Sequence, residues 1–436
     1  MFFIPVYILI LAFTIVIDYF AGIYLEKTPQ PKKKLYLIIS LIANISVLAV
    51  FKYYNFLNDN LTSLLSGFGI HNEVPYLSIL LPIGLSFHTF QAMSYTIEVY
   101  RGNQKAERNF GIYALYVMFY PQLVAGPIER PQNLLHQFYE KHTFEIDRVI
   151  EGLKLMLWGF FKKLVIADRL AIYVNAVYGN VEHHSGISLV VATIFFAFQI
   201  YCDFSGYSDI AIGTARVMGF KLMTNFNRPY LARTIHEFWS RWHISLSTWF
   251  RDYMYISLGG NRVSIPRWYF NLFFVFLVSG LWHGANWTYL IWGGLNGLYL
   301  VFALITKKAR HKITVKTGYD RMHRLKTFVS IIFTFVLVCI SWIFFRANSV
   351  HDGIYVLMNM FSPGKLFIPN PSIMIYAIFA ILFLIAVEFK EEFFRGRFYI
   401  FHNKKAVVRY AAYLMLLILI VLIGVFDGGQ FIYFQF

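Results

Sequence analysis

The sequence predicts an all-α polytopic membrane protein. Of its 436 residues, 58% are hydrophobic and only 14% are charged, which is too little charge to cover the surface of a soluble protein of this length. Several apolar stretches reach the roughly 20 residues that a helix needs to cross a bilayer. Strands of a membrane barrel alternate apolar and polar residues, whereas stretches such as LMLLILIVLIGVF (414–426) are continuously apolar. The crossings are therefore expected to be helices.

Ten stretches qualify as crossings, and the charges between them predict their orientation. Four lysines lie in 26–34, eight Lys or Arg lie in 306–327 and six lie in 390–409. The loops 58–73 and 174–186 carry no Lys or Arg. Basic loops stay on the cytoplasmic side, so we expect the three basic loops inside and both chain termini outside. The ten expected crossings are 2–25, 35–57, 75–99, 150–173, 187–202, 268–282, 287–305, 328–345, 372–389 and 407–426.

The basic residues and the histidines argue against two kinds of partner. The net charge of +16 comes largely from loops on one side of the membrane, so no nucleic-acid partner is expected. His183 and His184 are adjacent in a loop, and the chain has no HxxxH or HExxH spacing. No metal site is therefore expected.

Three stretches do not fit simple crossings and predict a cavity that reaches into the membrane. The run 110–128 contains Pro121 and Pro127, so it is expected to be re-entrant. The stretch 150–173 contains three lysines and an aspartate, and 268–282 has only 15 residues, which is short for a bilayer. Irregular backbone persists at membrane depth only when it is buried in protein or lines a water-filled cavity.

A polar insert between two crossings predicts an amphipathic helix from about Ile235 to Tyr253. Glu237 and Arg241 are four residues apart, in the favourable order for an ion pair. The helix could lie in the membrane interface with aromatic anchors, or Arg241 and Arg251 could face the cavity and hold an anionic donor. The residue types leave donor binding and a structural role both open. One stripe of the helix contains Phe238, Trp242, Ser245 and Trp249.

Two aspartates in YCDFSGYSD (201–209) directly follow an apolar run, and we therefore expect them near membrane depth. A carboxylate at membrane depth costs about 2.5–3.5 kcal/mol on insertion scales, so Asp203 and Asp209 need partners or water. The alternative is a helix that ends here at the membrane interface.

The stretch VSGLWHGANW (278–287) contains the strongest candidate for catalysis. His283 ends a short crossing, and a neutral imidazole is the side chain best suited to accept a proton near pH 7. Gly280 and Gly284 are small enough to leave room for a ligand, and Asn286 is near enough to form a hydrogen bond. A structural histidine buried in an apolar helix is the alternative.

These stretches together resemble the bacterial branch of the membrane-bound O-acyltransferase family. The resemblance rests on RPYLARTIHEFWSRWHISLSTWFRDYMYISLGG (228–260) and SGLWHGANWTYLIWGGLNG (279–297). MFYPQLVAGPIERP (118–131) and DFSGYSD (203–209) also fit this branch, which includes the membrane subunits of alginate and peptidoglycan O-acetyltransferases. The resemblance implies a single domain over 1–436. It also implies a ring of about ten transmembrane helices, with re-entrant and interfacial helices, around a thinned central cavity.

The resemblance implies an O-acyltransferase of the bacterial cytoplasmic membrane. An acyl group passes from a cytoplasmic thioester to a hydroxyl of an extracellular or cell-wall polysaccharide; acetyl is the first expectation and D-alanyl transfer to teichoic acid is the alternative. The donor implied is acetyl-coenzyme A or another acyl thioester, and no bound cofactor is expected. The partners implied are membrane lipid, the polysaccharide acceptor and an extracytoplasmic esterase-like protein of the SGNH type. A transporter, the alternative from a different class, would usually show related halves, which the sequence lacks.

The resemblance also implies roles for single residues. It makes His283 the catalytic histidine and places His243 at the second family position. A thioester that meets a hydroxyl needs a base and a donor to the oxyanion, and the candidates for this donor are Asn286 and the indole of Trp282.

The last residues, FIYFQF (431–436), are expected to belong to an extracytoplasmic tail, 427–436, that folds back into an apolar groove. The spacing of Phe431, Tyr433 and Phe436 resembles a C-terminal motif of these acyl-transfer systems. That resemblance implies Tyr433 as a relay for the acyl group, and hydrophobic docking alone is the alternative.

Overall fold

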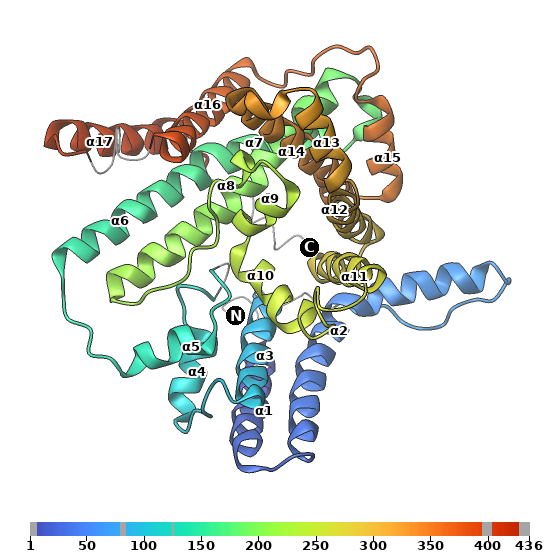
Figure 1. The fold of residues 1–436 in the computed structure, drawn as a ribbon, viewed down its shortest axis with the longest axis vertical. Helices are drawn as coiled ribbons and strands as arrows, with labels where there is room; N and C mark the ends of the chain where they lie inside the picture. The colour runs from blue at the N-terminus through green and yellow to red at the C-terminus, as the bar shows by residue number, and fades with distance from the viewer. Residues whose placement is uncertain (1–6, 79–83, 124–125, 395–402, 427–436) are drawn as a thin grey trace. The chain divides into compact units, whose positions relative to one another are not determined.

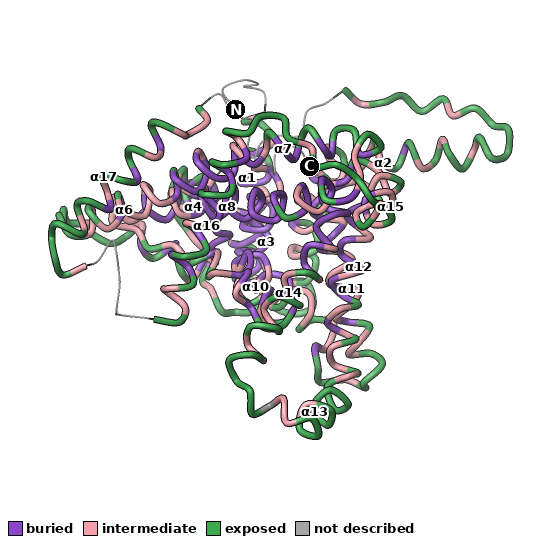
Figure 2. The backbone as a smooth tube through the Cα atoms, turned by 90° about the horizontal axis from the view of Figure 1, so that it is seen from above, coloured by how far each residue is buried: buried purple, intermediate pink, exposed green. Residues whose placement is uncertain are grey.

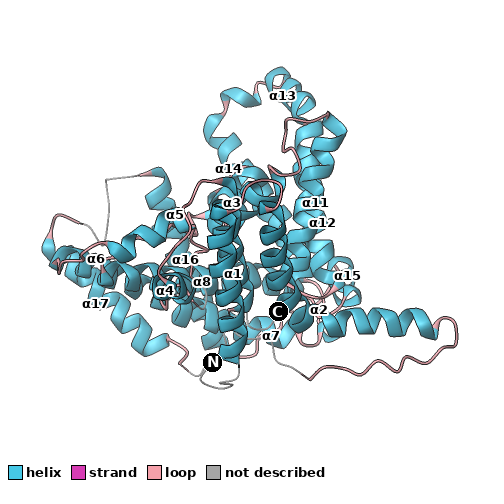
Figure 3. Ribbon diagram, turned by 90° about the horizontal axis from the view of Figure 1, so that it is seen from below, coloured by secondary structure: helices cyan, strands magenta, loops and turns pink. Residues whose placement is uncertain are grey.

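The computed structural model describes residues 7–78, 84–123, 126–394 and 403–426, and these residues form helices and loops with no β-strand (Figure 3). Among them, eight helices are long and apolar enough to cross a membrane. The prediction of an all-α polytopic membrane protein is thereby confirmed. The eight helices are α1 (Tyr7–Lys27), α2 (Lys33–Ser66), α8 (Ile187–Met218), α11 (Ile265–His283), α12 (Trp287–Ile305), α14 (His323–Arg346), α16 (Pro371–Phe393) and α17 (Ala406–Ile423).

The chain forms two compact units, and the first comprises Met1–Arg148 and Ala215–Met223. In this unit α1, α2 and α3 (Leu85–Arg101) pack against one another (Figure 1). Their contact contains a buried carboxylate, Asp18, which accepts hydrogen bonds from Ser40 Oγ at 2.6 Å and from Asn44 Nδ2 at 2.8 Å. The short helices of the unit are α3 (Leu85–Arg101), α4 (Phe110–Met118) and α5 (Pro131–Leu134).

The second unit comprises Val149–Thr214 and Thr224–Phe436. Its core is aromatic, and Trp242, Trp292 and Trp342 are each 1% exposed. By contrast, α13 (Lys307–Lys316) has no buried residue (Figure 2). The remaining helices are α6 (Ile146–Phe160), a π-helical segment (Phe161–Ala167), α7 (Asp168–Tyr178), α9 (Ile235–Arg241), α10 (Ile244–Trp249), a second π-helical segment (Phe250–Tyr255), α13 (Lys307–Lys316) and α15 (Val350–Asn359).

Helices α11 and α12 form a tight pair because glycines face each other across their contact. A Cβ atom added at Gly280 would collide with the Tyr289 carbonyl group, and one added at Gly293 would collide with the Phe276 carbonyl group. Small residues let helix backbones approach closely inside a membrane. Gly280 on α11 and Gly293 on α12, which lie before and after His283 in the sequence, therefore let α12 lie close beside α11.

The structure corrects the bounds of several expected crossings. The stretch expected at 187–202 is part of α8, which continues to Met218, and the stretch expected at 268–282 is the 19-residue helix α11. Helix α11 is therefore not unusually short for a crossing, and its length does not support local thinning of the membrane. The run 110–128 contains the nine-residue helix α4, too short to cross.

Two of the ten expected crossings are not among the eight. The stretch 150–173 is divided into α6, the π-helical segment and α7. The crossing expected at 75–99 lies partly outside the described residues, and its described part is α3, which has 17 residues. The C-terminal tail 427–436, with Tyr433, lies outside the described residues as well.

Candidate active site

The predicted helix from Ile235 to Tyr253 is interrupted at His243, and the prediction of one continuous helix is wrong. His243 has a φ of 41° and separates α9 from α10. Its neighbours bond to another part of the chain: the Ile244 amide donates to the Asn225 carbonyl oxygen at 2.9 Å. These non-local hydrogen bonds replace the helical ladder, and periodicity along the sequence does not reveal them.

The stripe of Phe238, Trp242, Ser245 and Trp249 faces the interior of the second unit. Their exposed fractions are 1%, 1%, 0% and 5%. Trp242 packs against Trp342, with ring centroids 5.0 Å apart. The expectation that these tryptophans anchor the chain in the membrane interface is therefore wrong for Trp242 and Trp249, which are core residues.

Asn225 holds the imidazole of His243 in one tautomer. The Asn225 side-chain oxygen accepts hydrogen bonds from the Ser245 amide at 3.2 Å and from the Ser245 hydroxyl at 2.9 Å. The same oxygen lies 3.1 Å from His243 Nδ1. Since a backbone amide can only donate, this atom is the acceptor, and His243 Nδ1 must carry a proton. Nε2 of His243 then holds the lone pair.

His243 is electrically neutral at neutral pH. Burial lowers the pKa of its imidazole well below the usual value, and the charge that His283 can carry lowers this pKa further. The two histidines are thus close enough to influence each other, although 40 residues of sequence separate them. Sequence reasoning missed Asn225, because nothing in the sequence shows that residues 225 and 243 come together.

His283 is the last residue of α11, and its side chain is 4% exposed. Its Nδ1 lies 2.6 Å from the Ser279 carbonyl oxygen, one helical turn earlier. A carbonyl oxygen can only accept, so Nδ1 donates and Nε2 holds the lone pair. Aromatic rings surround the imidazole edge to face: the ring centroids of Trp282, Trp292 and Phe345 lie 4.8, 4.7 and 5.6 Å from that of His283.

The residues that were expected to assist His283 have other contacts. The Asn286 side chain caps the start of α12 by accepting from the Thr288 amide at 2.9 Å. A Cβ atom at Gly284 would collide with the ring of Tyr289. Gly280 and Gly284 therefore permit close helix packing, and the expectation that they leave room for a ligand is wrong.

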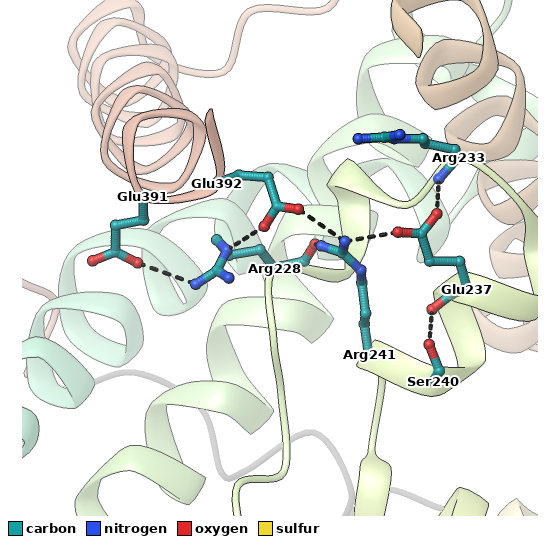
Figure 4. A network of polar contacts seen from close by, with 7 residues as sticks. All are labelled: Arg228, Arg233, Glu237, Ser240, Arg241, Glu391 and Glu392. Atoms are coloured by element: carbon teal, nitrogen blue, oxygen red, sulfur yellow. Dashed lines mark hydrogen bonds and ion pairs between the residues drawn. The ribbon is translucent and has the colours of Figure 1, made fainter. Parts of the chain in front are cut away.

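Arg241 belongs to a network of ion pairs (Figure 4). Its guanidinium group lies 2.7 Å from Glu237 and 2.9 Å from Glu392, so the predicted pair with Glu237 is confirmed. Arg228 lies 2.8 Å from Glu392 and 3.5 Å from Glu391. Three carboxylates thus neutralise two guanidinium groups and tie the start of the insert to the end of α16. Of the two roles left open for Arg241, these contacts favour the structural one.

Arg251 differs from Arg241 in its exposure. Its side chain is 60% exposed, and the Nε atom lies 2.7 Å from Asp252. An exposed ion pair holds a guanidinium group only weakly. Arg251 therefore keeps the ability to exchange this partner for an anionic ligand.

Two buried lysines on the first π-helical segment are paired with the aspartates of α8. Lys163 lies 2.6 Å from Asp203 and 2.8 Å from Asp168, and Lys162 lies 2.5 Å from Asp209. Asp203 and Asp209 therefore lie within α8 and have lysine partners on the π-helical segment. The alternative of a helix end at Asp203 is wrong. Within the described part of the chain, no three His, Cys, Asp or Glu side chains gather as metal ligands would.

The fold and this site define a multi-pass membrane protein with two buried histidines, of which His283 is the last residue of a crossing helix. Residues 108–345 match the sequence profile of the membrane-bound O-acyltransferase family. The matched range includes both histidines, and it covers more than half of the chain. The protein belongs to the membrane-bound O-acyltransferase family.

Three curated relatives show which members of the family the chain is similar to. The chain is 43% identical over 329 residues to the probable alginate O-acetylase AlgI of Pseudomonas aeruginosa; the match covers 76% of this chain but only 61% of that relative. It is 36% identical over 381 residues to the peptidoglycan O-acetyltransferase of Helicobacter pylori, covering 81% of this chain and 70% of that relative. It is 26% identical over 292 residues to the teichoic acid D-alanyltransferase of Bacillus subtilis, covering 64% and 71%.

Proposed function

We propose that the protein is a membrane O-acyltransferase that moves an acetyl group from a cytoplasmic thioester to a hydroxyl of an extracellular or cell-wall polysaccharide. The observation that carries the proposal is the hydrogen bond from His283 Nδ1 to the Ser279 carbonyl oxygen, which leaves Nε2 as a base among buried aromatic rings. The relatives named for O-acetylation are 43% and 36% identical, against 26% for the relative named for D-alanyl transfer. Acetyl is therefore favoured over D-alanyl.

In the proposed reaction His283 moves one proton. Nε2 removes the proton from the acceptor hydroxyl as its oxygen attacks the carbonyl carbon of the thioester. The new C–O bond forms, the carbonyl electron pair moves onto oxygen, and its return breaks the C–S bond. The thiolate leaves and takes the proton from His283. Such proton transfer by a positioned side chain contributes about 10²–10⁴-fold to the rate.

His243 takes a positioning role in this proposal. Because burial and His283 keep it neutral, it accepts no proton at neutral pH and can orient the acceptor or donor through Nε2. Asn225 disfavours turning over of the ring, since rotation would replace Nδ1–H by a C–H group at the Asn225 oxygen and lose this hydrogen bond. A neutral second histidine also avoids a permanent positive charge beside the base.

The setting of the reaction is also part of the proposal. The protein lies in the bacterial cytoplasmic membrane with both termini outside, and the exposed Arg251 is the candidate for the donor's phosphates. An extracytoplasmic SGNH-type protein makes the final transfer to the polymer. Tyr433 carries the acyl group from the His283 site to this partner protein.

A deletion strain tests the proposed function and separates it from its alternatives. Loss of ester-linked acetate from one envelope polysaccharide, restored by the intact gene, supports acetyl transfer. Loss of ester-linked D-alanine from teichoic acid would replace acetyl with D-alanyl. Unchanged esters on every polymer, with altered uptake of a solute, would favour a transporter and overturn the proposal.

A further inference from the structure

One face of α12 carries a row of buried polar atoms. Thr288, Trp292 and Asn296 are four residues apart, so they lie on the same side of the helix. Their exposed fractions are 0%, 1% and 1%. Within the described residues, Thr288 Oγ1, Trp292 Nε1 and Asn296 Oδ1 have no hydrogen-bond partner. A buried polar atom without a partner costs about 1–3 kcal/mol, so a row of three indicates a polar ligand.

This row begins beside the catalytic candidate. The ring of Trp292 lies 4.7 Å from that of His283 at an angle of 69°. Trp239 on α9 packs against Trp292 at 5.7 Å, and its buried Nε1 also lacks a partner among the described residues. Buried donors thus gather where a reacting group would meet His283.

The chemistry of the row is directional. An indole N–H can only donate, so Trp292 suits a carbonyl oxygen. Asn296 Nδ2 donates to the Trp292 carbonyl oxygen at 2.9 Å, which identifies the other amide atom of Asn296 as an oxygen that can only accept. Asn296 therefore suits an N–H group, roughly 6 Å further along the helix from Trp292.

We propose that the row binds the thioester donor and that Trp292 is a catalytic residue. Its N–H donates to the thioester carbonyl oxygen and stabilises the negative charge that develops there when the hydroxyl attacks. Asn296 accepts a hydrogen bond from an amide N–H on the donor's arm, and Thr288 supplies a further polar contact. The inference rests on the proposed function, and it replaces Trp282 and Asn286 as the donor to the oxyanion.

The experiment measures thiol release from acetyl-coenzyme A by the purified full-length protein. Trp292→Phe removes the N–H and keeps an aromatic ring, so kcat should fall by about 10²–10³-fold, as for other oxyanion donors. Trp342→Phe is the matched control: Trp342 is also 1% exposed and stacks on Trp292 at 5.8 Å. The control should retain wild-type kcat within a few-fold. If Trp292→Phe does not accumulate, benzothienylalanine at this position keeps the double ring and lacks only the N–H.

Two further measurements separate catalysis from packing. Trp292→Phe should weaken binding of a ketone analogue of acetyl-coenzyme A but leave binding of the ethyl thioether, which has no carbonyl group, unchanged. Asn296→Leu should raise KM with little change in kcat. Wild-type kcat in the Trp292 variant, or equal loss of affinity for both analogues, would overturn the inference. Absence of thiol release by the wild-type protein would instead count against the proposed function.

Discussion

The side-chain oxygen of Asn225 lies 3.1 Å from His243 Nδ1, and this contact joins residues 18 positions apart in the sequence. It fixes the tautomer of the second histidine and positions the break between α9 and α10. The same oxygen accepts from Ser245, so the ring cannot turn over without loss of a buried hydrogen bond. Burial of the His243 imidazole lowers its pKa, and the charge that His283 can carry lowers this pKa further, so His243 is neutral.

His243 should make stability depend on pH. Burial lowers its pKa in the folded state, so the unfolded chain binds a proton more readily below its own pKa of about 6.5. The contribution of His243 is therefore fully present above about pH 6.5 and is lost as the pH falls. We expect the melting temperature in detergent to drop less between about pH 7.5 and 5.5 for His243→Asn than for the wild type. An equal drop in both proteins would contradict a neutral His243.

The pair of Lys162, which is buried, and Asp209, whose side chain is 20% exposed, should tolerate joint replacement better than single replacement. In the wild-type protein the Asp209 carboxylate lies 2.5 Å from the Lys162 ammonium group. The Lys162→Met variant leaves this carboxylate without its charge partner. Breaking a buried pair typically costs about 3–5 kcal/mol, whereas exchanging both partners for apolar residues can be neutral. Unfolding in detergent and denaturant should show Lys162→Met far less stable than Lys162→Met/Asp209→Leu. Similar stability of the two variants would mean that the pair is not buried in the folded protein.

The sequence predicted the helical class and the Glu237–Arg241 pair, because each depends on local pattern or side-chain chemistry. It failed where distant segments interact. The break at His243 is accompanied by hydrogen bonds that the Ile244 and Ser245 amides donate to Asn225, and Asp203 inside α8 is paired with Lys163. The sequence also did not single out Trp292, because a tryptophan at helical spacing resembles an ordinary core residue until the contacts of its N–H are known.

Labelling of single cysteines should report the orientation of the chain. The native thiols, Cys202 and Cys339, are buried, so the background should be low. Lys312→Cys places a thiol on the exposed helix α13, and His71→Cys places one in the charge-poor loop. With an impermeant maleimide on intact cells, we expect labelling at position 71 and labelling at position 312 only after the membrane is opened. The reverse pattern would place the basic loops outside.

Tyr433 should be needed for acyl transfer to the polymer and not for accumulation of the protein in the membrane. Tyr433→Phe removes the phenolic oxygen that is proposed to carry the acyl group, and a phenol leaves readily after it has been acylated. Polymer acetate should be lost while the variant accumulates in the membrane as the wild type does. Normal acetylation in this variant would restrict the tail to hydrophobic docking.

The central claim is that His283 is the base, and the most direct measurement is acyl transfer by His283→Ala compared with His136→Ala, an exposed histidine of the first unit. Both proteins should be present in the membrane in equal amounts. Thiol release from the donor and acetate on the polymer should fall by at least about 10²-fold in His283→Ala and stay at the wild-type level in His136→Ala. Wild-type transfer by a well-expressed His283→Ala protein would contradict the account.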